Sequence, residues 1–138
     1  MLEDVFNFQI GTAEDSYNLN AAVIQVGSDW LVSLGGGTRP HIGAVAIAQP
    51  RPSMMDEQVI SSTASVFCLL GHKEDVIVKE ASEKLAASLN TNVVVTAGIH
   101  WENIDQQGIQ KIIGNSRILI RKIQEKIEQG GDETCHEK

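Results

Sequence analysis

The spacing of apolar residues changes along this chain, from strand-like alternation before residue 72 to helix-like repeats after it. Short aliphatic runs bounded by turn residues predict six strands, at residues 5–10, 21–26, 30–34, 44–48, 65–70 and 92–97. Apolar residues at every third or fourth position predict amphipathic helices over 72–89 and from about 105 onward. Consecutive strands joined by short turns pair antiparallel, and each helix needs an apolar surface to cover. We therefore expect an α+β fold: a mixed, mainly antiparallel sheet with two amphipathic helices packed on one face.

One segment interrupts the strand pattern. Residues 49–53 are Gln-Pro-Arg-Pro-Ser, and proline lacks the N–H that a central strand donates. We expect the chain to leave the sheet here and to return near Ser65. The length of 138 residues suits one compact domain. We assign residues 1–129 to a single α+β domain and 130–138, which lack apolar periodicity, to a mobile C-terminal tail.

The charge balance limits the class of partner. The chain has 11 basic and 18 acidic residues, and a formal charge of −7 argues against nucleic acid or an anionic membrane as partner. No apolar run approaches the roughly 20 residues of a membrane span, and the first residues lack a signal-peptide pattern, so a cytoplasmic location is expected. Cys68 lies in an apolar run and is expected in the core rather than in a disulfide.

The segment 35–43 is rich in groups that can contact a ligand. It is Gly-Gly-Gly-Thr-Arg-Pro-His-Ile-Gly, and it lies between two apolar runs. Glycines let a backbone approach a ligand closely, while the three polar side chains offer a hydroxyl, a guanidinium and an imidazole. A permissive turn between two strands is the alternative interpretation, although such a turn does not need Arg and His. The candidate binding residues are Gly36, Gly37, Thr38, Arg39 and His41.

Two further histidines follow a glycine where a predicted strand meets a predicted helix. Residues 71–73 are Gly-His-Lys, and residues 98–102 are Gly-Ile-His-Trp-Glu. The unpaired amides of a helix start attract anions, and an aromatic ring can stack on a flat ligand. Exposed loop histidines without a ligand are the alternative. The candidates are His72, Lys73, His100, Trp101 and Glu102, and we expect both junctions to converge with the glycine segment on one pocket.

Familiar catalytic motifs are missing from the sequence. It has no dinucleotide fingerprint, phosphate-loop lysine, His-Glu-x-x-His helix, Cys-x-x-Cys pair or serine elbow. Histidines and carboxylates can still gather in space as metal ligands or as acid and base. A small enzyme or metal-binding protein using His41, His100 and Glu102 therefore stands as one alternative function. A structural subunit whose histidines bind nothing stands as another.

Three segments taken together resemble one known family. They are Gly-Gly-Thr-Arg-Pro-His-Ile-Gly at 36–43, Gly-His-Lys-Glu-Asp at 71–75 and Thr-Ala-Gly-Ile-His at 96–100. The likeness covers about residues 6–127 and is to the LpdD-like prenylated-flavin chaperones, the small D subunits of gallate (hydroxyarylic acid) decarboxylase systems. The family motif often has Asp soon after the last histidine, where this chain has Trp101 and Glu102. The resemblance implies a non-catalytic binding protein for prenylated FMN or FMN. Its client would be a UbiD-type decarboxylase, with a flavin prenyltransferase as a further partner.

A flavin nucleotide combines a phosphate with a large flat ring, so its site needs anion donors beside an apolar or aromatic face. The candidate phosphate donors are the amides of Gly36, Gly37 and Thr38 with the side chains of Arg39 and Lys73, and the candidate ring contacts are His41, His100 and Trp101. Aromatic residues make up 4% of the chain, too few to enclose a flavin easily. The Ile-rich final helix also offers more apolar surface than a small sheet needs. We therefore expect a homo-oligomer.

Overall fold

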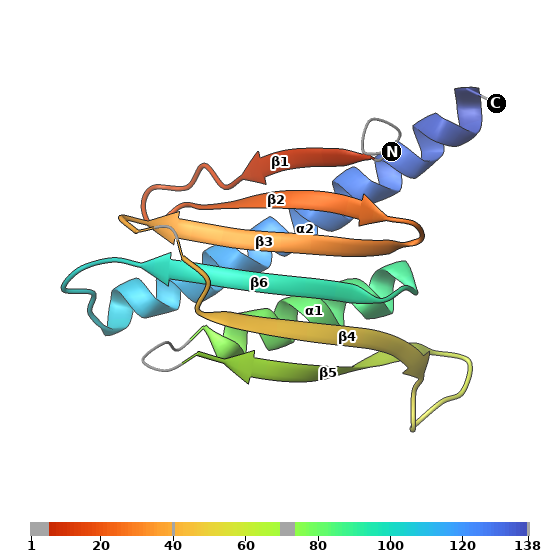
Figure 1. Cartoon of the computed structure of the whole chain (residues 1–138), viewed down its shortest axis with the longest axis horizontal. Coiled ribbons are helices and arrows are strands. Elements are labelled where there is room, and N and C mark those ends of the chain that lie inside the picture. Colours follow the sequence, from red (N-terminus) through yellow and green to blue (C-terminus); the bar gives the residue numbers. More distant parts are fainter. Residues whose placement is uncertain (1–5, 40, 70–73, 138) are drawn as a thin grey trace.

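The computed structural model describes residues 6–39, 41–69 and 74–137, with side chains described as far as Gly130. Six strands form one sheet in the order β1-β2-β3-β6-β4-β5. Their bounds are β1 (Asn7–Gly11), β2 (Leu19–Val26), β3 (Asp29–Gly37), β4 (Ala44–Pro52), β5 (Ile60–Cys68) and β6 (Val93–His100). Strands β3 and β6 run parallel, and the other neighbouring pairs are antiparallel. Helices α1 (Asp75–Leu89) and α2 (Gln106–Glu137) both lie behind the sheet (Figure 1). The expected α+β class, with two helices on one face of a mainly antiparallel sheet, is confirmed.

The core lies between the sheet and the two helices. Every second side chain of the inner strands is buried, as expected for strands with one face on a core. Both helices contribute the apolar stripe that their spacing predicts. The buried strand residues are Leu19, Ala21, Val23, Trp30, Val32, Leu34, Ala44, Ala46, Ala48, Val93, Val95 and Ala97. The other face of the sheet, away from the helices, is called the open face below.

The apolar stripe of α2 is used within the chain. Five of its residues are at most 8% exposed, namely Ile112, Leu119, Ile120, Ile123 and Ile127, whereas Ile109 at the first turn is 42% exposed. The stripe covers the sheet, so it is not the surplus surface from which we expected self-association. The helix also continues to Glu137, through the segment assigned to a tail. Neither helix, in the described part of the chain, is both long and apolar enough to cross a membrane.

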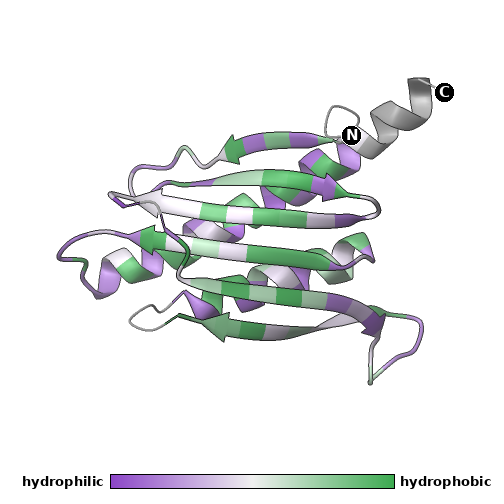
Figure 2. Cartoon of the chain, viewed as in Figure 1, coloured by the Kyte–Doolittle hydropathy of each residue, from purple (hydrophilic) through white to green (hydrophobic). Residues whose placement is uncertain are grey.

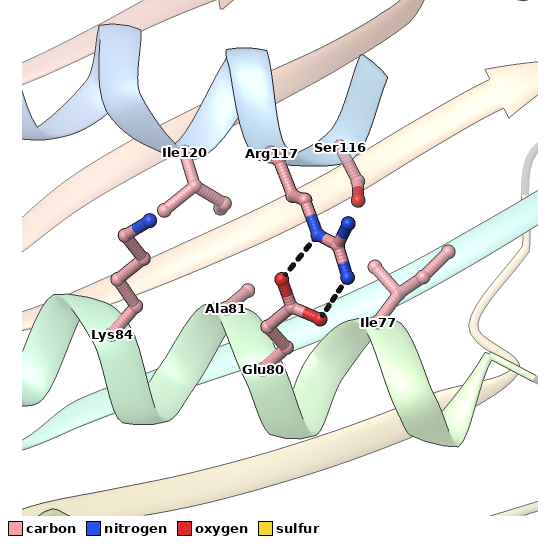
Figure 3. Close-up of a pocket in the computed structure, with 7 residues that line it drawn as sticks. All are labelled: Ile77, Glu80, Ala81, Lys84, Ser116, Arg117 and Ile120. Atoms are coloured by element: carbon pink, nitrogen blue, oxygen red, sulfur yellow. Dashed lines mark hydrogen bonds and ion pairs between the residues drawn. The ribbon is translucent and has the colours of Figure 1, made fainter. Parts of the chain in front are cut away.

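The two helices contact each other through an ion pair. Arg117 Nε donates to Glu80 Oε1 at 2.7 Å, and Arg117 Nη2 donates to Glu80 Oε2 at 3.3 Å (Figure 3). These hydrogen bonds, and to a lesser extent the guanidinium charge, lower the pKa of Glu80, although partial burial opposes them. The gap beside the pair has a volume of about 10 Å³, which suits about one water molecule. We interpret this place as a helix contact rather than a ligand site.

The strand order differs from the expected meander because β6 separates β3 from β4. Leu34 pairs with Ala97 on one side of β6, and Ala44 pairs with Ala97 on the other. The run Val-Val-Val-Thr-Ala of β6 suits a central position, since apolar residues there occupy both faces. Strand β6 lies 63 residues along the chain from its partners in β3 and 45–53 residues from its partners in β4. Local turn patterns carry no information about such distant pairing.

Strand β4 also runs through the proline segment, contrary to our expectation. It pairs with β6 from Ala44 to Ala48, but with β5 all the way to Pro52. Beyond Ala48 the described pairing of β4 is with β5 alone. Pro50 and Pro52 are tolerated because β4 has one neighbour there, and a missing N–H that faces an edge breaks no ladder bond.

Cys68 is exposed at the end of β5, not buried as expected. Strand β5 is an outer strand of the sheet, so its last residues have neighbours on one side. An apolar run therefore does not ensure burial when its strand lies at an edge.

Candidate binding site where the chain crosses strand β6

Between β3 and β4 the chain crosses the end of β6. Strands β3 and β6 end together, with Gly37 opposite His100, and β4 starts on the far side of β6. Residues 38–39 and 41–43, together called the crossing segment, pass over the open face in front of β6 (Figure 1). Thr38 N donates to His100 O at 2.9 Å, and Gly43 N donates to Ala97 O at 2.8 Å. Both ends of the crossing segment are thereby fixed to β6.

Two glycines make this crossing sterically possible. A Cβ at Gly98 would lie 1.7 Å from the carbonyl oxygen of His41. A Cβ at Gly37 would lie 1.8 Å from the carbonyl oxygen of His100, and its φ of +90° is one that other residues rarely adopt. The glycine run was expected to be a loop, but residues 35–37 are the end of β3. Their role in the fold is close backbone packing.

His41 meets hydrogen-bond acceptors at both ring nitrogens. Its Nδ1 lies 2.9 Å from the carbonyl oxygen of Arg39, and its Nε2 lies 3.1 Å from Glu74 Oε1. A carbonyl and a carboxylate can accept but not donate, so each ring nitrogen of His41 faces an acceptor. Glu74 Oε1 also accepts from the backbone N–H of Ile99 at 3.2 Å. Glu74 thereby links His41 to β6 beside the crossing.

Glu74 is a site residue that the sequence analysis did not single out. It stands at the N-cap position of α1 and is 7% exposed. Its carboxylate also lies against Gly43, where an added Cβ would be 2.2 Å from Glu74 Oε2. An acidic residue in the first turn of a predicted helix is a common sequence feature, so spacing alone gave no sign of burial. In the fold it joins the crossing segment, β6 and the start of α1.

Arg39 and His100 form the exposed half of the site. Arg39 Nη2 lies 3.1 Å from His100 Nε2, so that nitrogen accepts and the ring carries its proton on Nδ1. Glu102 Oε1 lies 3.9 Å from the same nitrogen, and the Glu102 side chain is 72% exposed. A guanidinium has five N–H donors, and this contact uses one of them. Arg39 can therefore donate to an anion while it keeps its contact with His100.

Trp101 lies on the helix side of the sheet, away from the two histidines. Its ring meets Tyr17 edge to face, with the ring centroids 5.1 Å apart, and packs against the core. A Cβ at Gly36 would lie 3.1 Å from Trp101 Cη2 and 2.5 Å from Leu19 Cδ2. Both Gly36 and Trp101 are therefore packed on the core rather than grouped with the histidines.

The structure brings part of the predicted set together. The residues gathered at the end of β6 are Gly37, Thr38, Arg39, His41, His100 and Glu102. His72 and Lys73 lie outside the described residues. Residues 98–100 were expected at a strand-to-helix junction, but they are the last residues of β6, and α2 begins later, at Gln106.

A shallow hollow of about 280 Å³ lies on the open face beside His41. Small residues line it, among them Gly35, Gly98, Ser33 and Ala22, with the amide side chains of Gln9 and Asn20 at its border. This volume is near the lower end of the roughly 300–1,000 Å³ typical of ligand pockets. A lining of small residues with two amide side chains and a histidine suits a flat polar ligand.

Metal binding has less support from the geometry. Within the described residues, no three His, Cys, Asp or Glu side chains gather as metal ligands. His41 already faces an acceptor at each nitrogen, and His100 Nε2 faces Arg39.

These features define a small one-sheet α+β protein with a polar surface site at a strand crossing. The chain belongs to the family described as the prenylated flavin chaperone LpdD-like domain, whose model matches residues 13–128. It is 29% identical over 113 residues to Protein LpdD of Lactiplantibacillus plantarum, covering 81% of this chain and 79% of that protein. The family resemblance seen in the sequence is confirmed.

A solved structure supports the fold. The chain is similar to one in the crystal structure of a novel chaperone complex for yeast 20S proteasome assembly. The TM-score is 0.53 at 13% identity, over 94% of this chain and 98% of the other. At this identity the likeness concerns the fold alone.

Proposed function

We propose that this chain is a non-catalytic, cytoplasmic carrier of prenylated FMN or FMN that delivers its cargo to a UbiD-type decarboxylase. A flavin prenyltransferase would supply the prenylated cofactor. Membership of a family described as prenylated flavin chaperones supports this function. The structural observation that carries it is the open-face hollow bordered by His41, next to the exposed guanidinium of Arg39.

In the proposed binding mode the flat ring lies over the small residues of the hollow. The amides of Gln9 and Asn20 face its polar edge, and Arg39 binds the phosphate through charge-assisted hydrogen bonds. The hollow is open to solvent and buries a ligand incompletely, which limits affinity. Limited affinity suits a carrier, because the cargo has to leave for the decarboxylase.

Titration of FMN and riboflavin against wild type and Arg39→Ala tests the phosphate contact. Losing a charge-assisted hydrogen bond costs about 1.5–3 kcal/mol, so FMN affinity is expected to fall roughly ten- to a hundredfold. Riboflavin has no phosphate, and its affinity should change far less. Arg121→Ala, which removes an exposed arginine of α2, is the matched control and should leave both affinities unchanged.

Three other results would reject either the role of Arg39 or the carrier function. Equal losses for FMN and riboflavin would remove Arg39 from the phosphate role. An unchanged FMN affinity would remove it from the site. If wild type binds neither prenylated FMN nor FMN, the carrier function itself is wrong.

A further inference from the structure

Strand β5 lacks the features that usually prevent the edge of a sheet from pairing with another chain. It is the last strand of the sheet on its side, and no described strand pairs with its outer edge. Short length, charged residues, proline and bulges are the usual protections of an edge strand. Strand β5 has nine residues, none of them charged and none proline, and its register with β4 runs from Ile60 to Cys68 without a bulge. By contrast β1, at the opposite edge, has five residues.

The pairing of β5 with β4 shows which backbone groups face outward. Leu69 N donates to Gly43 O at 2.8 Å, in the same register as the β4–β5 ladder. In an antiparallel strand the backbone groups of successive residues point to alternate sides. Ser62, Ala64 and Val66 therefore direct their N–H and C=O groups away from β4. Within the described residues, no backbone hydrogen bond reaches these groups from outside the sheet.

A hollow of about 390 Å³, called the edge hollow, lies between β5 and α1. Its apolar part consists of Val66 and Val76, which are 38% and 58% exposed. Val66 pairs with the buried Ala46, so its side chain is on the helix side of the sheet. The last residues of β5, at its arrowhead, are coloured as hydrophobic in Figure 2. A strand added beside β5 would direct every second side chain to the helix side, next to this hollow.

The rest of the edge hollow is charged, with an excess of carboxylates. It is lined by Asp75, Lys79, Glu80 and Glu83. Lys79 pairs with Glu83, and Arg117 pairs with Glu80, so Asp75 adds a negative charge that neither pair balances. A lysine or arginine can lay its aliphatic stem along apolar surface and keep its charged end beside carboxylates. The edge hollow therefore suits a basic side chain.

We infer that β5 binds an extended segment of a partner protein as an added strand, with a lysine or arginine of that segment in the edge hollow. In such complexes main-chain hydrogen bonds give affinity, and pockets for alternate side chains give specificity. A second copy of this chain is a poorer occupant. Pairing β5 with β5 would bring together two acidic hollows and two chains of formal charge −7.

The inference does not rest on flavin binding, and its test uses no flavin. The probe is a capped peptide that alternates valine and lysine, and the control peptide has glutamate in place of each lysine. In an NMR titration, wild type should bind the lysine peptide at least about tenfold more tightly than the glutamate peptide. Saturating lysine peptide should slow hydrogen exchange at the amides of Ser62, Ala64 and Val66. The amides of β1, at the opposite edge, should be unaffected.

Val66→Pro tests the edge directly, because proline removes an outward N–H and leaves the ladder with β4 intact. It should weaken binding of the lysine peptide by about tenfold or more. Val66→Ile keeps the N–H, so this matched control should bind as wild type does. Circular dichroism checks that both variants are folded.

Glu83→Lys tests the charge of the edge hollow, and it also serves if Val66→Pro does not fold. It should weaken binding of the lysine peptide and strengthen binding of the glutamate peptide. Glu125→Lys, at an exposed site on α2, makes the same change in net charge and is the matched control, with little effect expected.

Four results would overturn the inference. Wild type could bind neither peptide, or a folded Val66→Pro variant could bind the lysine peptide as wild type does. Equal effects of Glu83→Lys and Glu125→Lys would mean that attraction is long-range and does not involve the edge hollow. Protection of the Ala64 and Val66 amides that rises with protein concentration in the absence of peptide would mean that a second copy occupies the edge.

Discussion

At the scale of single residues, Glu74 connects the parts of the site. Its carboxylate accepts from His41 and from the backbone of Ile99, and it lies against the backbone at Gly43. Arg39 lies two residues before His41, and its carbonyl oxygen is 2.9 Å from His41 Nδ1. Whatever holds His41 therefore also limits where the guanidinium of Arg39 can lie. Glu74 is therefore a positioning residue in our account, while Arg39 is the residue proposed to touch the ligand.

Glu74→Ala is expected to lower the free energy of unfolding by about 1–3 kcal/mol, because the His41 ring and the Ile99 N–H both lose their buried acceptor. Glu83→Ala on the same helix removes a surface pair with Lys79 and should cost about 0.5 kcal/mol or less. Urea denaturation near neutral pH measures both. Equal costs for the two variants would mean that Glu74 does not hold the crossing.

At the scale of elements, the contact between α1 and α2 combines apolar packing with the pair of Glu80 and Arg117. Both side chains are largely exposed, with 42% and 60% of their surfaces accessible. Solvent screens such a pair, so packing against the sheet rather than the ion pair fixes the two helices.

The pair should nevertheless give the stability of the protein a small pH dependence. The pKa of Glu80 in the folded chain lies below its ordinary value of 4.5. Its contribution is therefore complete above the unfolded-state pKa and is lost as pH falls through the lower folded-state pKa. Glu80→Gln should reduce the melting temperature slightly near neutral pH, with a difference that shrinks at pH values below about 4. Glu125→Gln, at an exposed site on α2, is the control and should show no such pattern. A Glu80→Gln difference that stays constant with pH would contradict this account.

At the scale of the whole molecule, the two apolar surfaces have different roles. The stripe of α2 is covered by the sheet and stabilises the fold, whereas Ile24, Ile47 and Phe67 on the open face are exposed and add little to the core. Substitutions in the two surfaces should therefore affect different measurements.

Leu119→Ala separates these roles. Leu119 is fully buried, so its truncation should lower the free energy of unfolding by about 2–5 kcal/mol. The mass in solution should stay that of wild type, because this side chain faces the sheet. Ile109→Ala, at a position 42% exposed on the same helix, should cost about 0.5 kcal/mol or less. A change of mass with little loss of stability would instead place the α2 stripe in an interface.

Local periodicity was enough to predict the elements. Helix α1 and the start of α2 follow from apolar spacing that one helix face must satisfy, and each of the six strands overlaps the aliphatic run that predicted it. The fold class follows as well, since two amphipathic helices need a sheet to cover. The residues gathered around Arg39, His41 and His100 were also singled out by their chemistry and by the resemblance to LpdD-like proteins.

Tertiary structure alone decided the rest. The place of β6 between β3 and β4 depends on pairing between distant segments, and no short window of sequence specifies it. That pairing turned the glycine run into a strand end, buried Glu74 beneath the crossing and separated Trp101 from His100. It also selected which side of each strand the helices cover, and so left Ile24, Ile47 and Phe67 exposed on the open face. Sequence by itself determined which segments form helices and strands, because those preferences are local, whereas burial and neighbourhood arise from contacts that exist once the sheet is assembled.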